Sequence, residues 1–287
     1  MSPSAPGRLR VAAIGEIAHA ALGRSGGQAR VLARLSASTY LTAGDEIVWL
    51  GAVGSELHPR AILAAAAPPG DEEIVRLDSG ALTPWQPPAL SLERAGAQRL
   101  VVGWRRLAGA AAALGPVGGF GVLVTGAPLA FPLDGARDVA AALADACARD
   151  DAAAGAEAAM ALLGLGGGLT PSGDDFVGGA LFARGLLGAA RGADAAAWRR
   201  AGEAVCRAAR ARTHPISATL LGDLVAGRGW ASLHELVAAL AAGATTPAAA
   251  AARRLVRLGH TSGWDLLAGL GAGLGGHADD ERRRRAV

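Results

Sequence analysis

The chain of 287 residues contains no lysine and no asparagine, and all 28 of its basic residues are arginine. Without lysine, the protein has no Schiff-base nucleophile and no P-loop lysine. An anionic ligand must therefore be bound by arginine, backbone N–H groups, hydroxyls or a metal. These absences exclude the lysine-dependent enzyme classes before any motif is considered.

Aromatic residues and cysteines are also scarce. Aromatic residues make up 4% of the chain, whereas it has 42 glycines and long alanine-rich stretches, a composition that favours close packing of helices. Cys147 and Cys206 lie far apart and have no metal-type spacing. We therefore expect two buried free thiols and no zinc site.

The chain has little net charge and no long uninterrupted apolar run. Its net charge is +3, and we interpret Arg282–Arg285 as a terminal tail rather than a nucleic-acid patch. Met1–Arg10 has no apolar signal core, and no apolar run reaches about 18 residues. We expect a cytoplasmic protein that binds neither nucleic acid nor membrane.

The pattern changes near Asp134, which predicts an α+β protein. Residues 1–133 form a β-rich mixed region, and residues 134–287 form a helical domain. Strands are expected in the partly alternating stretch Gln28–Leu41 and in the short apolar runs that follow. These runs are Glu46–Val53, Ile74–Leu77, Leu100–Trp104 and Val122–Thr125, and the proline-rich Thr83–Pro88 is expected to be a loop.

Helical spacing of apolar residues dominates the second region. The predicted helices are one or two over Asp138–Leu163, then Ser172–Ala190, Ala195–Arg212, Ile216–Ala226, Ser232–Ala242, Pro247–Leu258 and Ser262–Leu274. Short glycine, threonine or proline breaks separate them. The result is an all-helical domain of ordinary size.

The most distinctive segment runs from Gly164 to Asp175 (GLGGGLTPSGDD), where a glycine cluster precedes the start of a helix. Glycine clusters suit backbone with positive φ or a close approach to a ligand. Free N–H groups and the macrodipole at a helix start attract anions. A capping box alone explains Ser172 and Asp175. It does not explain Gly166–Gly168 or the second carboxylate of Asp174, so we interpret the segment as a functional site.

A second segment repeats the pattern. Thr261–Gly269 (TSGWDLLAG) aligns with the first segment as Ser-Gly-x-Asp, so Ser262 and Asp265 correspond to Ser172 and Asp175. We hypothesise that the two helix N-termini face one another across one pocket. Two ordinary capping boxes with small residues for close packing are the alternative.

A third segment, Arg212–Thr219 (RTHPISAT), also opens a helix with hydroxyl groups. The guanidinium of Arg212 can bind a carboxylate or phosphate through two parallel hydrogen bonds. His214 is a candidate acid or base, and a histidine with a purely structural role is an equal alternative. The glycine cluster does not match the dinucleotide fingerprint, because the segment before it is helical.

Three strings carry a family resemblance: GLGGGLTPSGDDFVGG, RTHPISATLL and GHTSGWDLLAGL. In this order they resemble the signatures of the AllH-like family, long catalogued as a domain of unknown function, over roughly Ala159 to Gly275. One branch is the third subunit type of the bacterial oxamate carbamoyltransferase of anaerobic allantoin breakdown. The chain departs from the family at Gly167, where proline is usual, and at His214, where threonine is frequent.

The resemblance implies a transferase subunit that interconverts oxalurate plus phosphate with oxamate plus carbamoyl phosphate, or that acts on a related ureido acid. It implies other enzyme subunits as partners and a small anionic substrate such as phosphate, carbamoyl phosphate or an oxamate-like acid. The predicted catalytic residues are Asp174, Asp175 and Asp265. The predicted substrate- and phosphate-binding residues are Gly166, Gly167, Gly168, Thr170, Ser172, Gly173, Arg212, Thr213, Ser217, Ser262 and Gly263.

Two other functions fit the same residues. In the first, the chain is a helical hydrolase in which Asp174 and Asp175 bind Mg²⁺, although two carboxylates are few ligands for that ion. In the second, it is a non-catalytic scaffold subunit that binds a small molecule. No metal ligand set and no cofactor other than this alternative Mg²⁺ is assigned from the sequence.

Overall fold

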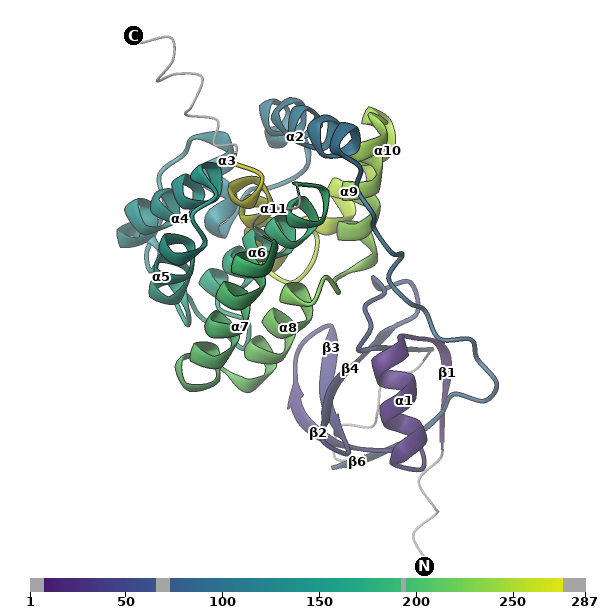
Figure 1. Ribbon diagram of the computed structural model, residues 1–287. Helices are drawn as coiled ribbons and strands as arrows, with labels where there is room; N and C mark the ends of the chain where they lie inside the picture. The colour runs from purple at the N-terminus through teal and green to yellow at the C-terminus, as the bar shows by residue number, and fades with distance from the viewer. Residues whose placement is uncertain (1–7, 66–72, 192–194, 276–287) are drawn as a thin grey trace, which may run out of the picture. The chain divides into compact units, whose positions relative to one another are not determined.

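The computed structural model describes residues 8–65, 73–191 and 195–275, and the arginine run at 282–285 lies outside them. The chain forms two compact units, Met1–Pro88 and Ala89–Val287. The first contains the strands and the second is helical, which confirms the predicted α+β class (Figure 1). Within the described residues, no helix is both long and apolar enough to span a membrane.

Six strands of the first unit close into a mixed barrel in the order β1-β5-β4-β3-β2-β6. Neighbouring strands are antiparallel except for β1 with β6 and β4 with β5, which are parallel. The strands are β1 (Leu9–Ile14), β2 (Gln28–Arg34), β3 (Ser38–Ala43), β4 (Glu46–Ala52), β5 (Ala61–Ala64) and β6 (Ile74–Asp78).

The barrel has its own hydrophobic core. β6 alternates exposed and buried residues, so Val75 and Leu77 point inward, whereas β4 is a nearly continuous apolar run. Helix α1 (Glu16–Arg24) packs Ala18, Ala21 and Leu22 into the same core. Period-two patterning and one amphipathic helix therefore account for the unit.

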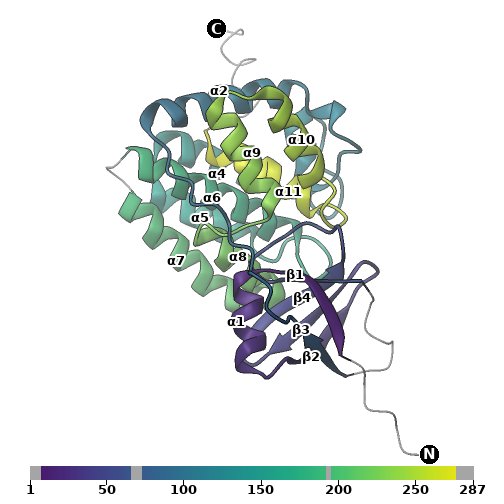
Figure 2. The ribbon, with the colours of Figure 1, turned by 90° about the vertical axis from the view of Figure 1, so that its right-hand side faces the viewer.

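Helices and short 3₁₀ turns build the second unit around a separate core (Figure 2). The helices are α2 (Arg94–Gly109), α3 (Val122–Thr125), α4 (Arg137–Arg149), α5 (Ala152–Leu162), α6 (Ser172–Arg191), α7 (Ala195–Arg212), α8 (Pro215–Val225), α9 (Ala231–Ala242), α10 (Thr245–Leu255) and α11 (Ser262–Gly273). The 3₁₀ turns are η1 (Ala111–Ala113), η2 (Gly119–Gly121) and η3 (Asp134–Ala136).

Helices α6 and α11 form the centre of this unit, with α4 and α5 on one side and α9 and α10 on the other (Figure 1). The pair packs backbone against backbone. A Cβ at Gly269 of α11 would overlap the carbonyl oxygen of Phe176, and a Cβ at Gly179 of α6 would overlap that of Leu266. Glycines at these positions let the two helices, and thus their N-termini, lie unusually close.

The helices predicted from Asp138 onward are confirmed, but two of the predicted strands are wrong. Leu100–Trp104 lies in α2, where Leu100, Trp104 and Leu107 are buried at helical spacing. Val122–Thr125 forms the short helix α3, which ends at Gly126 in the left-handed conformation. Apolar runs this short are compatible with a strand or a helix, and packing against the other helices of the unit favours the helix.

The close contact between α6 and α11 predicts the effect of a single methyl group. Gly269→Ala should lower the free energy of unfolding by about 1–3 kcal/mol, because the new Cβ forces the helices apart. The matched control is Gly185→Ala, in α6, where a Cβ has nothing within 4 Å and should stabilise by about 0.5–1 kcal/mol. Chemical denaturation measures both, and equal effects would contradict this packing.

Candidate functional site

The turn before α6 uses its glycines for their backbone freedom. Gly164, Gly166 and Gly168 have φ values of 75°, 113° and 85°, a left-handed region that favours glycine. A Cβ on Gly166 would lie 2.8 Å from the backbone nitrogen of Ser172, so the turn folds back onto the first residue of α6. Positive φ thus explains Gly164, Gly166 and Gly168, and close backbone approach also explains Gly164 and Gly166.

Asp174 joins this turn to the start of α8 through hydrogen bonds. Its Oδ1 accepts a hydrogen bond from the Gly164 amide (2.8 Å), and its Oδ2 accepts from the hydroxyls of Ser217 (2.6 Å) and Thr213. The first and third sequence segments therefore meet at one buried carboxylate. Asp174 holds the shape of the turn through these three donors.

The N-termini of α6 and α11 face one another, as the repeated pattern predicted. The hydroxyls of Thr170 and Ser262 are 3.2 Å apart, and so are those of Ser172 and Thr261. Each pair joins a residue of one segment to a residue of the other. The two starts meet through direct hydrogen bonds between hydroxyls rather than across open space.

The carboxyl groups of the two segments have crossed partners. Asp175 of α6 hydrogen bonds with Ser262 of α11, and Asp265 of α11 hydrogen bonds with Ser172 of α6. Both carboxyl groups are buried, and each has a buried Oδ2 atom without a hydrogen-bond partner among the described residues. The equivalent positions of the two segments thus form two similar half-sites.

Burial raises the pKa of both carboxyl groups. Desolvation raises the pKa of Asp265 to about 7, against the opposing hydrogen bonds from the Phe120 amide, Ser172 and Thr261. Burial also raises the pKa of Asp175 well above its ordinary value, opposed by the Ser262 hydrogen bond and assisted by the charges of Asp265 and Asp174. The raised pKa favours the protonated form of each carboxyl group, and in that form the group is a hydrogen-bond donor and a possible general acid.

Five successive backbone N–H groups of the turn, those of Gly166 to Thr170, have no hydrogen-bond partner among the described residues. Gly167 and Gly168 are exposed, and a Cβ at either position would meet nothing within 4 Å. The macrodipole of α6 adds partial positive charge beside them. This arrangement suits a small anion, and the raised pKa values of Asp175 and Asp265 weaken the repulsion between those carboxyl groups and the anion.

The remaining predicted site residues fall into two groups. Gly173 and Gly263 pack tightly against the carbonyl oxygens of Leu162 and Leu255, at equivalent places in the two segments. Arg212 is exposed, and its Nη1 donates to the carbonyl oxygen of Met160 (2.9 Å). Arg212 therefore borders the turn and keeps its other N–H groups available for a ligand.

His214 and the two cysteines have other surroundings. His214 is the N-cap of α8, and its Nδ1 accepts a hydrogen bond from the Ile216 amide (3.2 Å). Cys147 is buried and Cys206 is half-buried, and both are free thiols. The structure thus gives His214 a local capping role.

The segment at η2 is a component of the site that sequence reasoning missed. The Phe120 amide donates to Asp265 Oδ1 (2.6 Å), and a Cβ at Gly119 would overlap that carboxyl group. The Trp264 indole donates to the carbonyl oxygen of Pro116 (2.6 Å). The signal for this segment was its own glycine-rich string, Gly118-Gly119-Phe120-Gly121.

The aspartates do not fit a Mg²⁺ site. Protein donors already occupy both oxygens of Asp174, and burial raises the pKa of Asp175 and Asp265, which disfavours the ionised form that Mg²⁺ prefers. Across residues 8–65, 73–191 and 195–275, no group of three or more histidine, cysteine or acidic side chains could hold a metal ion.

The fold and the site define a class: an α+β protein whose helical domain has a polar centre made by two paired helix N-termini. Residues 162–274 match the family described as oxamate carbamoyltransferase subunit AllH. This match confirms the resemblance seen in the sequence. The match runs from the end of α5 to the end of α11 and so contains both segments. No curated protein and no solved structure gives a significant match.

The raised pKa of Asp265 predicts how stability depends on pH. The folded state holds this proton more tightly than the unfolded state, so the stabilisation present at low pH is lost as the pH rises through about 7. The free energy of unfolding should fall by on the order of a few kcal/mol between about pH 5 and pH 9. Asp265→Asn should flatten this decline in urea-unfolding curves.

The control is Asp145→Asn, which changes an exposed carboxylate on α4 and should leave the fall in the free energy of unfolding with pH unchanged. An unchanged decline in Asp265→Asn would show that other groups cause it.

Proposed function

We propose that the chain is a subunit of a carbamoyltransferase-type enzyme that binds phosphate at the turn Gly166–Thr170. The match of the helical segment to the AllH family supports the enzyme class. The proposal rests on one observation above all: the five unpaired amides of this turn lie beside the N-terminus of a buried helix. Because the chain has no lysine, backbone amides, hydroxyls and the neighbouring Arg212 are the groups available there for an anion.

The reaction is the transfer of a carbamoyl group between nitrogen and phosphate oxygen. A phosphate oxygen attacks the terminal carbonyl carbon of oxalurate, the bond from that carbon to the inner nitrogen breaks, and carbamoyl phosphate and oxamate form. The leaving nitrogen takes up one proton, and hydrogen phosphate loses one, so the step balances. A related ureido acid would react in the same way.

Each site residue has a role in this proposal. The amides of Gly166–Gly168 and the hydroxyl of Thr170 hold phosphate, Ser172 fixes the end of the turn through Thr261 and Asp265, and Arg212 binds the substrate carboxylate. Asp175, or Asp265 across the helix pair, passes a proton to the leaving nitrogen. Asp174 keeps the turn in place through Thr213, Ser217 and Gly164. Catalysis then depends mainly on positioning and on stabilising negative charge.

Phosphate binding is tested by straining the turn. Gly168→Ala should weaken phosphate binding by about tenfold, because alanine disfavours the φ of 85° that orients the amides. Gly227→Ala is the matched control, because Gly227 has a similar φ of 75° and a Cβ there also meets nothing within 4 Å. Gly227 lies after α8, outside the turn, so its substitution should leave phosphate binding unchanged. Isothermal titration with inorganic phosphate measures both, and equal weakening would contradict the assignment.

Activity is tested with the other subunit types of the enzyme present. Asp175→Asn should lower carbamoyl phosphate formation from oxalurate by about a hundredfold, because the variant cannot supply the proton. Asp145→Asn serves as the control, and a melting curve shows that each variant is folded.

If Asp174→Ala and Asp175→Ala each keep full activity, the assignment of the site to these residues is wrong. If phosphate stabilises the chain against heat but the assembly shows no turnover, the non-catalytic binding subunit becomes the better description.

A further inference from the structure

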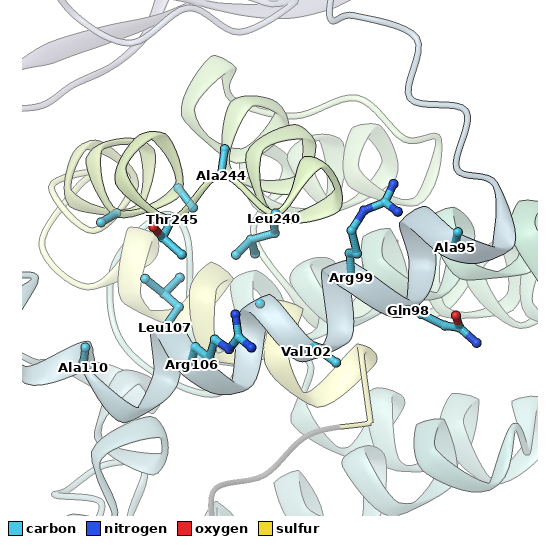
Figure 3. Close-up of a pocket in the computed structure, with 14 residues that line it drawn as sticks. Ala95, Gln98, Arg99, Val102, Arg106, Leu107, Ala110, Leu240, Ala244 and Thr245 are labelled. Atoms are coloured by element: carbon cyan, nitrogen blue, oxygen red, sulfur yellow. The ribbon is translucent and has the colours of Figure 1, made fainter.

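A cavity lies away from the paired helix starts, between α2 and the α9–α10 hairpin (Figure 3). This cavity has a volume of about 530 Å³, within the range of small-molecule sites. No predicted site residue lines it. Its walls are mostly apolar, and Val102, Leu107 and Leu240 supply the largest apolar side chains.

The charged side chains that line the cavity are all positive. Arg99 and Arg106 border it from one face of α2, seven residues apart, which corresponds to about 10 Å along the helix. No aspartate or glutamate lines it, and neither arginine forms an ion pair with a carboxylate of the described residues. Arg99 donates from Nε to the carbonyl oxygen of Ala241 (2.6 Å), whereas no side-chain hydrogen bond of Arg106 is seen there. Arg106 is therefore available to a ligand.

The start of α10 adds to the positive character of this cavity. Thr245, the first residue of α10, lines the cavity, and the preceding Ala244 provides no side-chain cap. The amide of Thr245 has no hydrogen-bond partner among the described residues, so the positive end of the helix dipole is uncompensated. Two guanidinium groups and a helix start thus border one apolar space, and a single negative charge would relieve their mutual repulsion.

We propose that this cavity binds a small amphipathic anion, with an apolar body against Val102, Leu107 and Leu240 and a single carboxylate at Arg106. The walls match an apolar body, and the charges match a carboxylate. Phosphate, oxamate and oxalurate have no apolar body, so this ligand is of another class than the proposed substrate. The site stands independently of the proposed function.

Octanoate and its uncharged analogue octanamide are suitable probes, used on the full chain below micelle-forming concentrations. Octanoate should bind in isothermal titration and raise the melting temperature, and octanamide should bind roughly tenfold more weakly. Arg106→Gln should remove this preference. Arg105→Gln is the matched control, because Arg105 is the exposed neighbour on α2 that does not line the cavity.

Filling the cavity provides the second test. Ala249→Phe places an aromatic ring in the lining and should abolish octanoate binding while the chain stays folded. Ala250→Phe is the control, since Ala250 is exposed on the same helix and does not line the cavity.

Equal binding of octanoate and octanamide would overturn the proposal, as would octanoate binding that survives Ala249→Phe. A change of oligomeric state in Ala249→Phe, measured by sedimentation, would also overturn it, because this face would then be an interface between copies of the chain.

Discussion

Hydrogen bonds between two helix starts hold the polar centre of the helical unit together. Ser172 and Asp175 of α6 meet Thr261, Ser262 and Asp265 of α11, and each carboxyl group finds its hydroxyl partner on the opposite helix. This arrangement requires the helix axes to come close, which glycines at the contact permit. The packing of α6 on α11 therefore fixes the relative positions of all three sequence segments.

The same burial that joins the helices determines their charge. Carboxylates beside a helix N-terminus ordinarily compete with an anionic ligand for the free amides. Here desolvation raises the pKa of Asp175 and Asp265, which favours their neutral form beside the turn and weakens this competition. Asp174 is also kept from this competition, because its oxygens are used by Gly164, Thr213 and Ser217. The amides of Gly166–Thr170 then remain for an external anion, which is the physical basis of the proposed phosphate site.

The helical half of the fold and the pairing of its two segments could be predicted from sequence. The helices carry long apolar periodicity, and the Ser-Gly-x-Asp repeat marks equivalent helix starts at Ser172 and Ser262. Strands β1 and β5 were not predicted, because four or six small and apolar residues carry little periodic signal. Sequence patterns also could not show that Asp265 pairs with Ser172 or that the Phe120 amide joins them, since both contacts span long sequence separations.

The central claim is that the turn before α6 presents unpaired amides to a phosphate ion, and amide-resolved NMR tests it most directly. In a phosphate titration, the amide resonances of Gly166 to Thr170 should shift together and saturate, with smaller changes at the start of α11. If these resonances stay in place while others saturate, the anion binds elsewhere and the turn serves only to pack the two helices.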